Sequence, residues 1–274
     1  MSCNLAASNV VGNRRAFVTT LFGGGYLKGA LALAKSLRIV DSAYPLVACC
    51  SGCSLDELTE LDKAGVIIQE LQEVVPPTSV TELNKRKGRM RWNRTFSKLS
   101  LLGLAGYDKI VTVDSDVLFL RNADELFYRP SMSAVVAGRG VHSDWVDLNS
   151  GVMVIEPSVG LYGRALEILD SLTKDDLLNY EGLGDQDILT LLNPNWKDSD
   201  SLHLPECYNA FQDCLAIYDS SGYLPFGDVK LVHFELTPKP WNYGLYDWAR
   251  LFRRALKMHS GAELKAVRAY RSLL

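Results

Sequence analysis

Short apolar runs alternate with helical patterns along the N-terminal part of the chain, and this alternation restricts the possible folds more than any other feature. An apolar run at 16–22 leads into Gly23-Gly24-Gly25, and a helical pattern at 26–38 follows. These segments are typical of a strand, a tight turn and a helix. Further strand-like runs lie at 46–50, 66–68, 109–113, 134–137 and 151–155. Strands separated by helices predict an α/β fold with a mainly parallel, doubly wound, Rossmann-like sheet.

The rest of the chain fits the same single domain. A helical pattern covers 161–172, a strand-like run lies at 230–234, and an amphipathic stretch rich in Arg and Lys covers 249–274. No linker, internal repeat or low-complexity tract divides the 274 residues. We therefore predict one domain over 1–274 with a helical segment at about 249–274. That segment either packs on its own domain or forms the contact of a homodimer.

The charge of the chain excludes some kinds of partner. A formal net charge of -3 provides no overall positive field for nucleic acid or an anionic membrane. Six basic residues lie within 85–94, in a loop that is either solvated or closes over an anionic ligand. No stretch approaches the ~20 apolar residues needed to span a bilayer, and no apolar leader opens the chain. We expect a cytoplasmic protein with reduced cysteines and no membrane or nucleic-acid partner.

Two acidic residues follow the strand-like run at 109–113. In Asp114-Ser115-Asp116 one residue separates the carboxylates, so an extended backbone directs both to the same face. They lie at the carboxyl end of a strand, where open α/β sheets form their ligand crevices. Two like charges this close need a neutralising cation, and hard oxygen ligands suit Mn²⁺ or Mg²⁺. A solvated acidic turn is the alternative interpretation.

A histidine interrupts a second apolar run. His233 follows Leu231-Val232 and precedes Phe234, and a hydrogen-bonded core histidine is the ordinary explanation for this pattern. An imidazole that joins Asp114 and Asp116 instead completes a mixed nitrogen and oxygen site, and this ligand set favours Mn²⁺ over Mg²⁺. We therefore predict a metal site formed by Asp114, Asp116 and His233.

The glycines at 23–25 precede a predicted helix, where a phosphate group can bind the helix N-terminus. Their spacing is not G-x-G-x-x-G, and the second predicted strand ends in cysteines rather than in an acidic residue, so a nicotinamide dehydrogenase is disfavoured. Tyr26 directly follows the glycines and is either a core residue or a face on which a nucleobase stacks.

A series of short motifs is more specific in its order and spacing than any single motif. The series consists of Ala16-Phe17-Val18-Thr19, Tyr26 with Lys28-Gly29-Ala30, Ser97-Lys98-Leu99, Asp114-Ser115-Asp116, Asn149-Ser150-Gly151-Val152, Gly184-Asp185-Gln186, and His233-Phe234 with Lys239-Pro240-Trp241. From about residue 16 to 241 the chain resembles glycosyltransferase family eight, and within it the glycogenin branch. The resemblance implies a GT-A fold with a small antiparallel sub-sheet, a UDP-sugar donor, Mn²⁺, and transfer with retention of anomeric configuration.

The resemblance also implies roles for individual residues. Asp114, Asp116 and His233 match the family's metal ligands. The positions that match its nucleotide-sugar contacts are Thr20, Tyr26, Lys98, Asp114, Ser115, Asn149, Ser150 and Lys239. The candidate catalytic residues are Asp185, Gln186 and Lys239. Lys239 adds positive charge beside the leaving UDP, and Asp185 and Gln186 lie on the far side of the sugar. Retention proceeds either through a carboxylate nucleophile or by attack on the face that UDP leaves, and the family's same-face route is the one we expect.

Three departures from the glycogenin pattern bear on specificity. Leu21-Phe22-Gly23 replaces a Thr-Thr-Asn-like contact to uracil, so hydrogen bonds to the base come from backbone or from elsewhere. Gly182 replaces the acidic residue expected three positions before Asp185, with Glu181 one place away. Leu236 replaces the glycine of the usual His-Phe-Leu-Gly run. The change at Gly182 leaves the donor sugar open between galactose and glucose, and the change at Leu236 bears on the contacts to phosphate.

These features predict a hexosyltransferase, and several acceptors fit. Tyr218 aligns with the tyrosine that glycogenins glucosylate on themselves, Tyr223 follows closely, and the chain stops at Leu274 without a long tail. We favour α-linked transfer of galactose, with glucose second, to an acceptor glycan on a cytoplasmic protein, as in relatives from some protists. The alternatives are a self-glucosylating primer, a galactinol synthase-like enzyme, and a sugar-nucleotide-binding scaffold without turnover. The resemblance also implies a homodimer.

Overall fold

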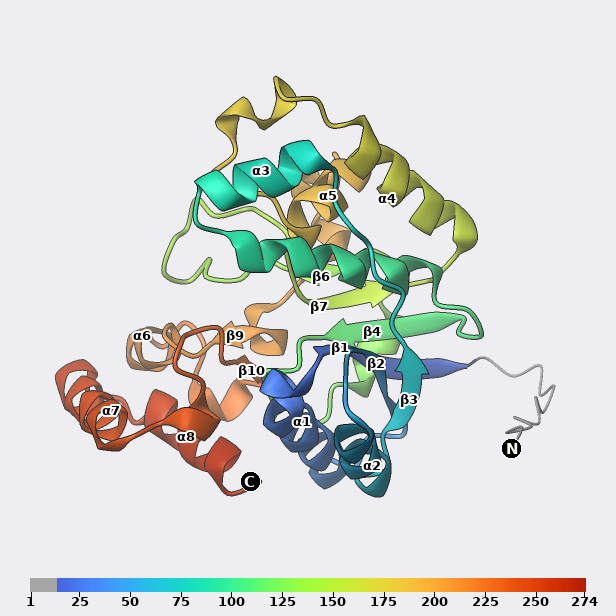
Figure 1. The fold of residues 1–274 in the computed structure, drawn as a ribbon. Helices are drawn as coiled ribbons and strands as arrows, with labels where there is room; N and C mark the ends of the chain where they lie inside the picture. Colours follow the sequence, from blue (N-terminus) through green and yellow to red (C-terminus); the bar gives the residue numbers. More distant parts are fainter. Residues whose placement is uncertain (1–13) are drawn as a thin grey trace.

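A computed structural model describes residues 14–274 of the protein. Seven strands form the main sheet in the order β3-β2-β1-β4-β7-β6-β8 (Figure 1). Their bounds are β1 Arg15–Phe22, β2 Leu46–Ser51, β3 Ile67–Glu70, β4 Lys109–Val113, β6 Ala134–Val135, β7 Asn149–Ile155 and β8 His203–Leu204. The pairs β3-β2, β2-β1, β1-β4 and β6-β8 are parallel, and β7 is antiparallel to β4 and β6. The predicted mainly parallel sheet is confirmed.

Helices cover both faces of the main sheet, as expected for strands that are apolar on both sides. One face packs against α1 and α2, and the other packs against α3, the 3-10 helix η2, α4 and α5 (Figure 1). Their bounds are α1 Leu27–Ile39, α2 Leu55–Lys63, α3 Thr78–Arg86, η2 Met90–Gly103, α4 Val159–Ser171 and α5 Asp185–Leu192. In β1, Phe17 and Leu21 face the α1 side while Ala16 and Val18 face the η2 side. This alternation makes β1 a fully buried strand.

A second, smaller sheet lies beside the first. It contains β5 (Val117–Phe119), β10 (Leu231–His233) and β9 (Ala210–Phe211), in the order β5-β10-β9. The β5-β10 pair is antiparallel, as predicted for the sub-sheet, and β9 adds a parallel strand at the edge. The chain passes from β4 in the main sheet directly to β5 in the small sheet. The residues between these two strands therefore lie where the sheets meet.

The C-terminal region packs against the small sheet. The stretch predicted to be helical at 249–274 consists of two helices, α7 (Leu245–Met258) and α8 (Ala262–Arg271), which follow α6 (Leu215–Ser221). His259 ends α7 with a φ of 49°, a left-handed conformation that stops the helix and reverses the chain. The resulting helix pair covers the small sheet and contributes Val267 and Tyr270 to its core.

Two other predicted segments have different bounds in the structure. The strand expected at 134–137 ends at Val135, and the register of β6 against β7 shifts between Ala134 and Val135. The basic loop expected at 85–94 instead comprises the end of α3, a turn at Gly88 and the start of η2.

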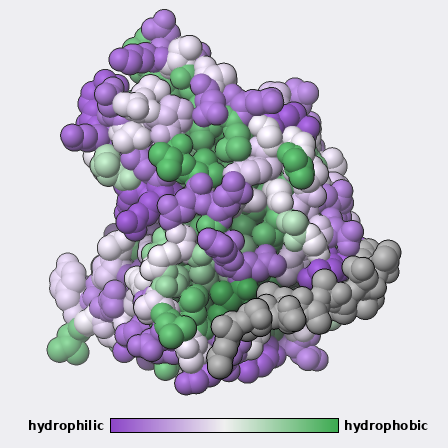
Figure 2. Space-filling view, turned by 45° about the vertical axis from the view of Figure 1, so that its right-hand side comes forward, coloured by the Kyte–Doolittle hydropathy of each residue, from purple (hydrophilic) through white to green (hydrophobic). Residues whose placement is uncertain are grey.

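The molecular surface is mixed in character. In Figure 2, hydrophilic side chains cover most of the visible face, and apolar side chains gather in small groups between them. Within residues 14–274, none of the helices combines the length and the apolar composition that crossing a bilayer requires.

Candidate active site

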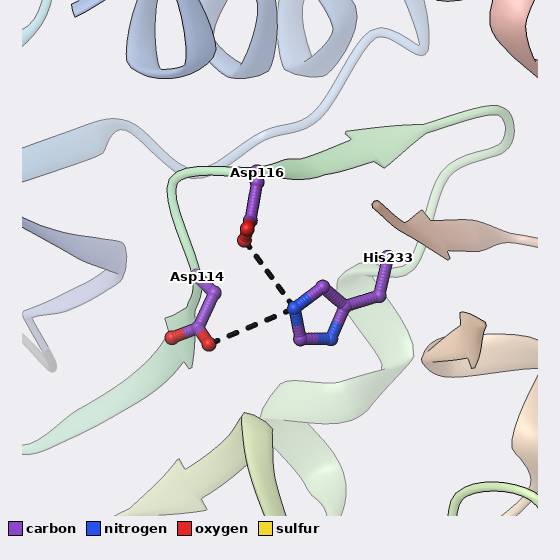
Figure 3. Close-up of side chains that lie close together, drawn as sticks. All are labelled: Asp114, Asp116 and His233. Atoms are coloured by element: carbon purple, nitrogen blue, oxygen red, sulfur yellow. Dashed lines mark ion pairs between the residues drawn. The ribbon is translucent and has the colours of Figure 1, made fainter. Parts of the chain in front are cut away.

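Three predicted metal ligands meet at the junction of the two sheets. Asp114 and Asp116 lie between β4 and β5, and His233 is the last residue of β10. Figure 3 shows the imidazole with one nitrogen directed at both carboxylates. The Nε2 atom of His233 lies 3.3 Å from an Asp116 oxygen and 3.8 Å from an Asp114 oxygen. One ligand atom from each residue lies within 4.8 Å of the other two.

A chain of hydrogen bonds determines the orientation of the His233 ring. The Gly151 N–H donates to Asn149 Oδ1 at 2.9 Å, so this amide oxygen is identified by a backbone donor. Asn209 Nδ2 then donates to the same oxygen at 2.7 Å, which leaves Asn209 Oδ1 to face His233 Nδ1 at 3.0 Å. An amide oxygen only accepts, so Nδ1 carries a proton. The Nε2 atom is thereby left on the side of the two carboxylates, as metal-binding histidines require.

Each carboxylate also contacts a lysine. Lys98 Nζ lies 2.5 Å from Asp114 Oδ1, and Lys239 Nζ lies 2.7 Å from Asp116 Oδ2. Lys239 also donates to the Phe234 carbonyl oxygen at 2.6 Å. The lysines therefore bind one oxygen of each acid, while the other oxygen faces His233.

The pKa values reflect this mixture of burial and charge. Burial raises the pKa of Asp114, whereas His233 and Lys239 outweigh burial at Asp116 and lower the pKa of its carboxyl. Burial opposes the charge on Lys98, yet Asp114 and other nearby acids outweigh it and raise the pKa of its ammonium group. At His233, burial would lower the imidazole pKa, but the negative charge of Asp116 outweighs burial and raises it. The site therefore favours the positively charged forms of Lys98 and His233, which lie beside the two acids.

The donor set fits a divalent cation. Two carboxylate oxygens and one imidazole nitrogen lie within 4.8 Å of one another, and the ring tautomer is fixed by Asn209. Mixed oxygen and nitrogen ligands suit Mn²⁺ and related divalent ions. A purely structural acid cluster would not need a histidine held in the ligand orientation.

A cleft of about 420 Å³ opens beside these residues. Its walls include predicted site residues, namely Thr20, Tyr26, Lys98, Asp114, Ser115, Asp116, His233 and Lys239. A second cavity of about 600 Å³ shares Phe22 and Arg94 with this cleft and extends past the carboxyl ends of β1 and β2. The cleft therefore lies where ligand crevices form in α/β sheets.

The remaining predicted residues do not line this cleft. Ser150 and Asp185 line a small cavity of about 20 Å³ with Lys98 and Asp114. The Ser150 hydroxyl donates to Asp185 at 2.9 Å, and the Ser150 N–H donates to the Gln186 side-chain oxygen at 3.2 Å. Asn149 contacts Asn209 rather than the wall of the larger cleft.

The sequence interpretation missed several cleft residues. Arg91, Trp92 and Arg94 line the cleft without having been named individually, and their position favours the alternative in which the basic residues at 85–94 close over an anionic ligand. Glu235 also lines it, two residues after His233 and on the same side of an extended segment. Burial raises the Glu235 pKa to about 7. Asn209 had no recognisable signal, because its role depends on contacts distant in sequence.

A main sheet that delivers paired carboxylates to a histidine from a second sheet is the architecture of a GT-A glycosyltransferase. The crystal structure of the galactosyltransferase LgtC, in complex with donor and acceptor sugar analogues, superimposes with a TM-score of 0.57. It is 16% identical and covers 88% of this chain and 95% of LgtC. This likeness concerns the fold.

Sequence comparison identifies the family. The chain is 32% identical over 236 residues to Glycogenin-1 of Mus musculus and 33% identical over 236 residues to that of Homo sapiens, covering 84% of this chain. It spans 66% and 63% of the length of those two proteins. Galactinol synthase 2 of Arabidopsis thaliana is 27% identical over 85% of this chain and 75% of its own length. No model of a known protein family matches the chain. These relatives, which match most of this chain, support a glycogenin-like glycosyltransferase, as the motifs predict.

Proposed function

We propose that the protein is a Mn²⁺-dependent, retaining hexosyltransferase that takes galactose or glucose from a UDP-sugar and adds it in α-linkage to an acceptor glycan. The observation that carries this proposal is the convergence of Asp114, Asp116 and His233 at the edge of a cleft lined by basic side chains. A protein that only binds nucleotide sugars has less need of this leaving-group chemistry. The scaffold alternative is therefore disfavoured.

Basic side chains of the cleft would bind the diphosphate. Lys239, Arg91 and Arg94 line the same cleft as the metal ligands. Mn²⁺ bound there supplies a Lewis acid for the departing UDP. Lys239 is already held by Asp116 and the Phe234 carbonyl oxygen, so its charge needs little reorganisation when negative charge develops on the leaving group.

The base and ribose would lie beside Tyr26, whose ring centroid is 5.7 Å from Lys239 Nζ. Tyr26 is partly exposed, and its ring lies edge-on to Trp241 with centroids 5.6 Å apart. This contact fixes the ring, and a fixed aromatic ring offers a stacking face at low entropic cost. Thr20 and Ser115 lie on the same cleft wall and are placed to contact the nucleotide.

The sugar would lie in the cleft next to Lys98 and Asp114, which also line the small cavity of Ser150 and Asp185. Asp185 accepts from Ser150, and its charge contributes to the raised pKa of Lys98. A carboxylate already engaged by a hydroxyl and a nearby ammonium is a weak nucleophile. We therefore favour same-face transfer, in which Asp185 and Gln186 position the sugar, with Asn149 holding the adjacent backbone.

The identity of the sugar is the finer part of the proposal. Gly182 replaces an acidic residue of the glycogenin pattern, and a Cβ atom there would lie 3.0 Å from the ring of Trp92, a cleft residue. The cleft wall thus carries an aromatic ring where the glycogenin pattern predicts an acidic neighbour. Relatives with lower identity include a galactinol synthase, and we favour galactose over glucose for this chain.

The acceptor is proposed to be a separate molecule. Tyr218, the candidate for self-glucosylation, has no exposed surface, and its hydroxyl donates to Glu206 at 2.5 Å. Burial and this hydrogen bond raise the pKa of the Tyr218 hydroxyl, which disfavours its use as a nucleophile. Tyr223 is about half exposed and is the remaining internal candidate. A glycan acceptor on a cytoplasmic protein is consistent with the free cysteines among residues 14–274.

Assembly as a homodimer is part of the same proposal. On α7, Leu245, Ala249, Phe252 and Leu256 are exposed at the spacing of a two-helix seam. In a two-fold antiparallel pair the Asp247 end of one helix meets the Lys257 end of its partner, so opposite charges face each other. Light scattering on the wild type and on Leu256→Glu tests this contact; a dimeric variant would contradict it.

UDP release from a panel of UDP-sugars, with Mn²⁺ or with a chelator, tests the proposed activity. We expect metal-dependent hydrolysis of one UDP-hexose and an unchanged intact mass of the protein. Added hexose masses would instead support a primer, and a Tyr223→Phe variant would identify the acceptor tyrosine. Absence of release from every donor, with and without added glycosides, would reject the transferase in favour of a binding protein.

A further inference from the structure

Two exposed aromatic rings rest on one short segment near the active site. The loop at 136–148 connects β6 to β7. Trp145 in this loop is 44% exposed, and Tyr223 after α6 is 52% exposed. A Cβ atom on Gly138 would lie 2.6 Å from the Trp145 ring, and one on Gly140 would lie 2.3 Å from the Tyr223 ring. The two rings therefore pack directly against backbone, two residues apart.

A buried carboxylate fixes this segment. Glu206 accepts from the Gly138 N–H at 2.6 Å and from the Gly140 N–H at 3.0 Å. It also accepts from the Tyr218 hydroxyl at 2.5 Å, and burial together with the contact with Glu206 raises the pKa of the Tyr223 hydroxyl to about 12. One carboxylate thus holds the loop backbone and the tyrosine that supports it. The two exposed rings are therefore held in place before any ligand binds.

The same elements lead directly to the metal site. The loop ends at β7, whose first residue, Asn149, accepts from Asn209. Asn209 lies three residues after Glu206, donates its N–H to the Glu206 carbonyl oxygen at 3.0 Å, and orients His233. The aromatic surface and the metal ligands are therefore built on adjoining residues of the same two segments.

The chemistry of the surface suits a sugar ring. The imidazole of His142 stacks on the Trp145 ring with centroids 4.3 Å apart, so the exposed surface includes three aromatic groups. Aromatic faces carry partial negative charge and attract the C–H groups on the apolar face of a pyranose. Exposed Arg139 and Asp144 in the same loop can bond to sugar hydroxyls.

We propose that Trp145 and Tyr223 form the binding surface for the acceptor glycan, with Glu206 as the residue that positions the loop. This inference depends on the proposed transferase function for its biological role. The ligand class is an uncharged hexose-containing glycan that presents one hydroxyl to the donor sugar. Because neither ring lines the donor cleft, their removal affects the acceptor and leaves donor binding intact.

Kinetics with Trp145→Ala and Tyr223→Ala test the proposal. The probes are lactose, maltose and methyl hexosides, added to Mn²⁺ and the UDP-sugar that the wild type hydrolyses. We expect the KM for the accepted sugar to rise at least about tenfold, with donor hydrolysis in its absence unchanged. Tyr128→Ala removes another exposed tyrosine and serves as the matched control, with no expected change. Unchanged acceptor KM values in both loop variants would overturn the proposal.

A binding measurement separates this inference from the proposed activity. Titration of the same sugars against the wild type should change its tryptophan fluorescence, and Trp145→Phe should lose that change while keeping its thermal midpoint. If the wild type binds sugar in this way but hydrolyses no donor, the surface stands and the transferase proposal fails. If the wild type hydrolyses a donor but Trp145→Phe gives the same fluorescence change, the surface proposal fails alone.

Discussion

Two buried acidic sites in this protein are equally hidden from solvent and differ in their partners. Asp116 and Glu206 are each 7% exposed. Glu206 accepts from two backbone N–H groups and a tyrosine hydroxyl, all of them neutral. Asp116 faces His233 and Lys239, with Asp114 two residues before it.

The difference separates a structural carboxylate from a functional one. Neutral donors satisfy Glu206 completely within the fold, so its charge holds backbone in place. The acids at 114 and 116 lie together and depend on positive charge, which His233, Lys98 and Lys239 supply and which the proposed cation would increase. Burial alone therefore does not distinguish a structural carboxylate from a functional one. The groups that surround each carboxylate do.

Replacement of Asp116 by asparagine should have the largest effect on activity. Asp116→Asn keeps the size of the side chain but removes a charged metal ligand, so metal-dependent turnover should fall by about 1,000-fold, equivalent to several kcal/mol of transition-state stabilisation. UDP release measures this loss, and circular dichroism checks that the fold is retained. Near-normal turnover in a folded Asp116→Asn protein would contradict the assignment of the metal site.

Replacement of Glu206 should instead affect stability. Glu206→Leu leaves the buried Gly138 N–H, the partly buried Gly140 N–H and the Tyr218 hydroxyl without their acceptor, so the free energy of unfolding should fall by about 3 kcal/mol. Urea denaturation measures this change. The folded fraction should still hydrolyse donor at the wild-type rate. A rate loss as large as that of Asp116→Asn would show that the two acidic sites do not differ as we infer.

Asn209 contacts both acidic sites, because its backbone N–H donates to the Glu206 carbonyl oxygen and its side chain orients His233. Its replacement therefore tests how far the metal site depends on this connection. Asn209→Ala removes the acceptor that fixes the His233 ring, so the Kd for Mn²⁺ should rise by about 10- to 100-fold. Isothermal titration calorimetry measures the affinity. Asn195→Ala, on a surface turn, is the matched control. Equal affinities in all three proteins would show that the ring orientation is fixed without Asn209.

Tyr218→Phe should have the smallest effect. It removes one hydrogen bond to Glu206 and should lower the free energy of unfolding by about 1 kcal/mol, with turnover unchanged. Thermal unfolding and UDP release measure the two quantities. Loss of transfer without loss of stability would restore Tyr218 as an acceptor.

The sequence predicted the parts of this structure that local patterns encode. The apolar runs of β1, β2 and β4 and the spacing of Asp114 and Asp116 depend on neighbouring residues alone. Glu206 and Asn209 could not be found in this way, because their partners lie up to 68 residues away in the chain. His233 was predicted as a ligand only in combination with Asp114 and Asp116, because its apolar neighbours alone favoured a core role, and the family motifs matched the same residue.

The position of the metal ligands at a seam has a consequence for the abundance of the protein. Asp114 follows a strand of the main sheet and His233 ends a strand of the small one, so a bound cation fastens the two sheets together. Unfolding must then release the cation, and a free concentration 100 times its Kd adds about 2.7 kcal/mol to the free energy of unfolding. In a cell with too little of that cation, a larger fraction of this protein would be unfolded and degraded by proteases. The amount of the protein would then depend on the supply of the metal.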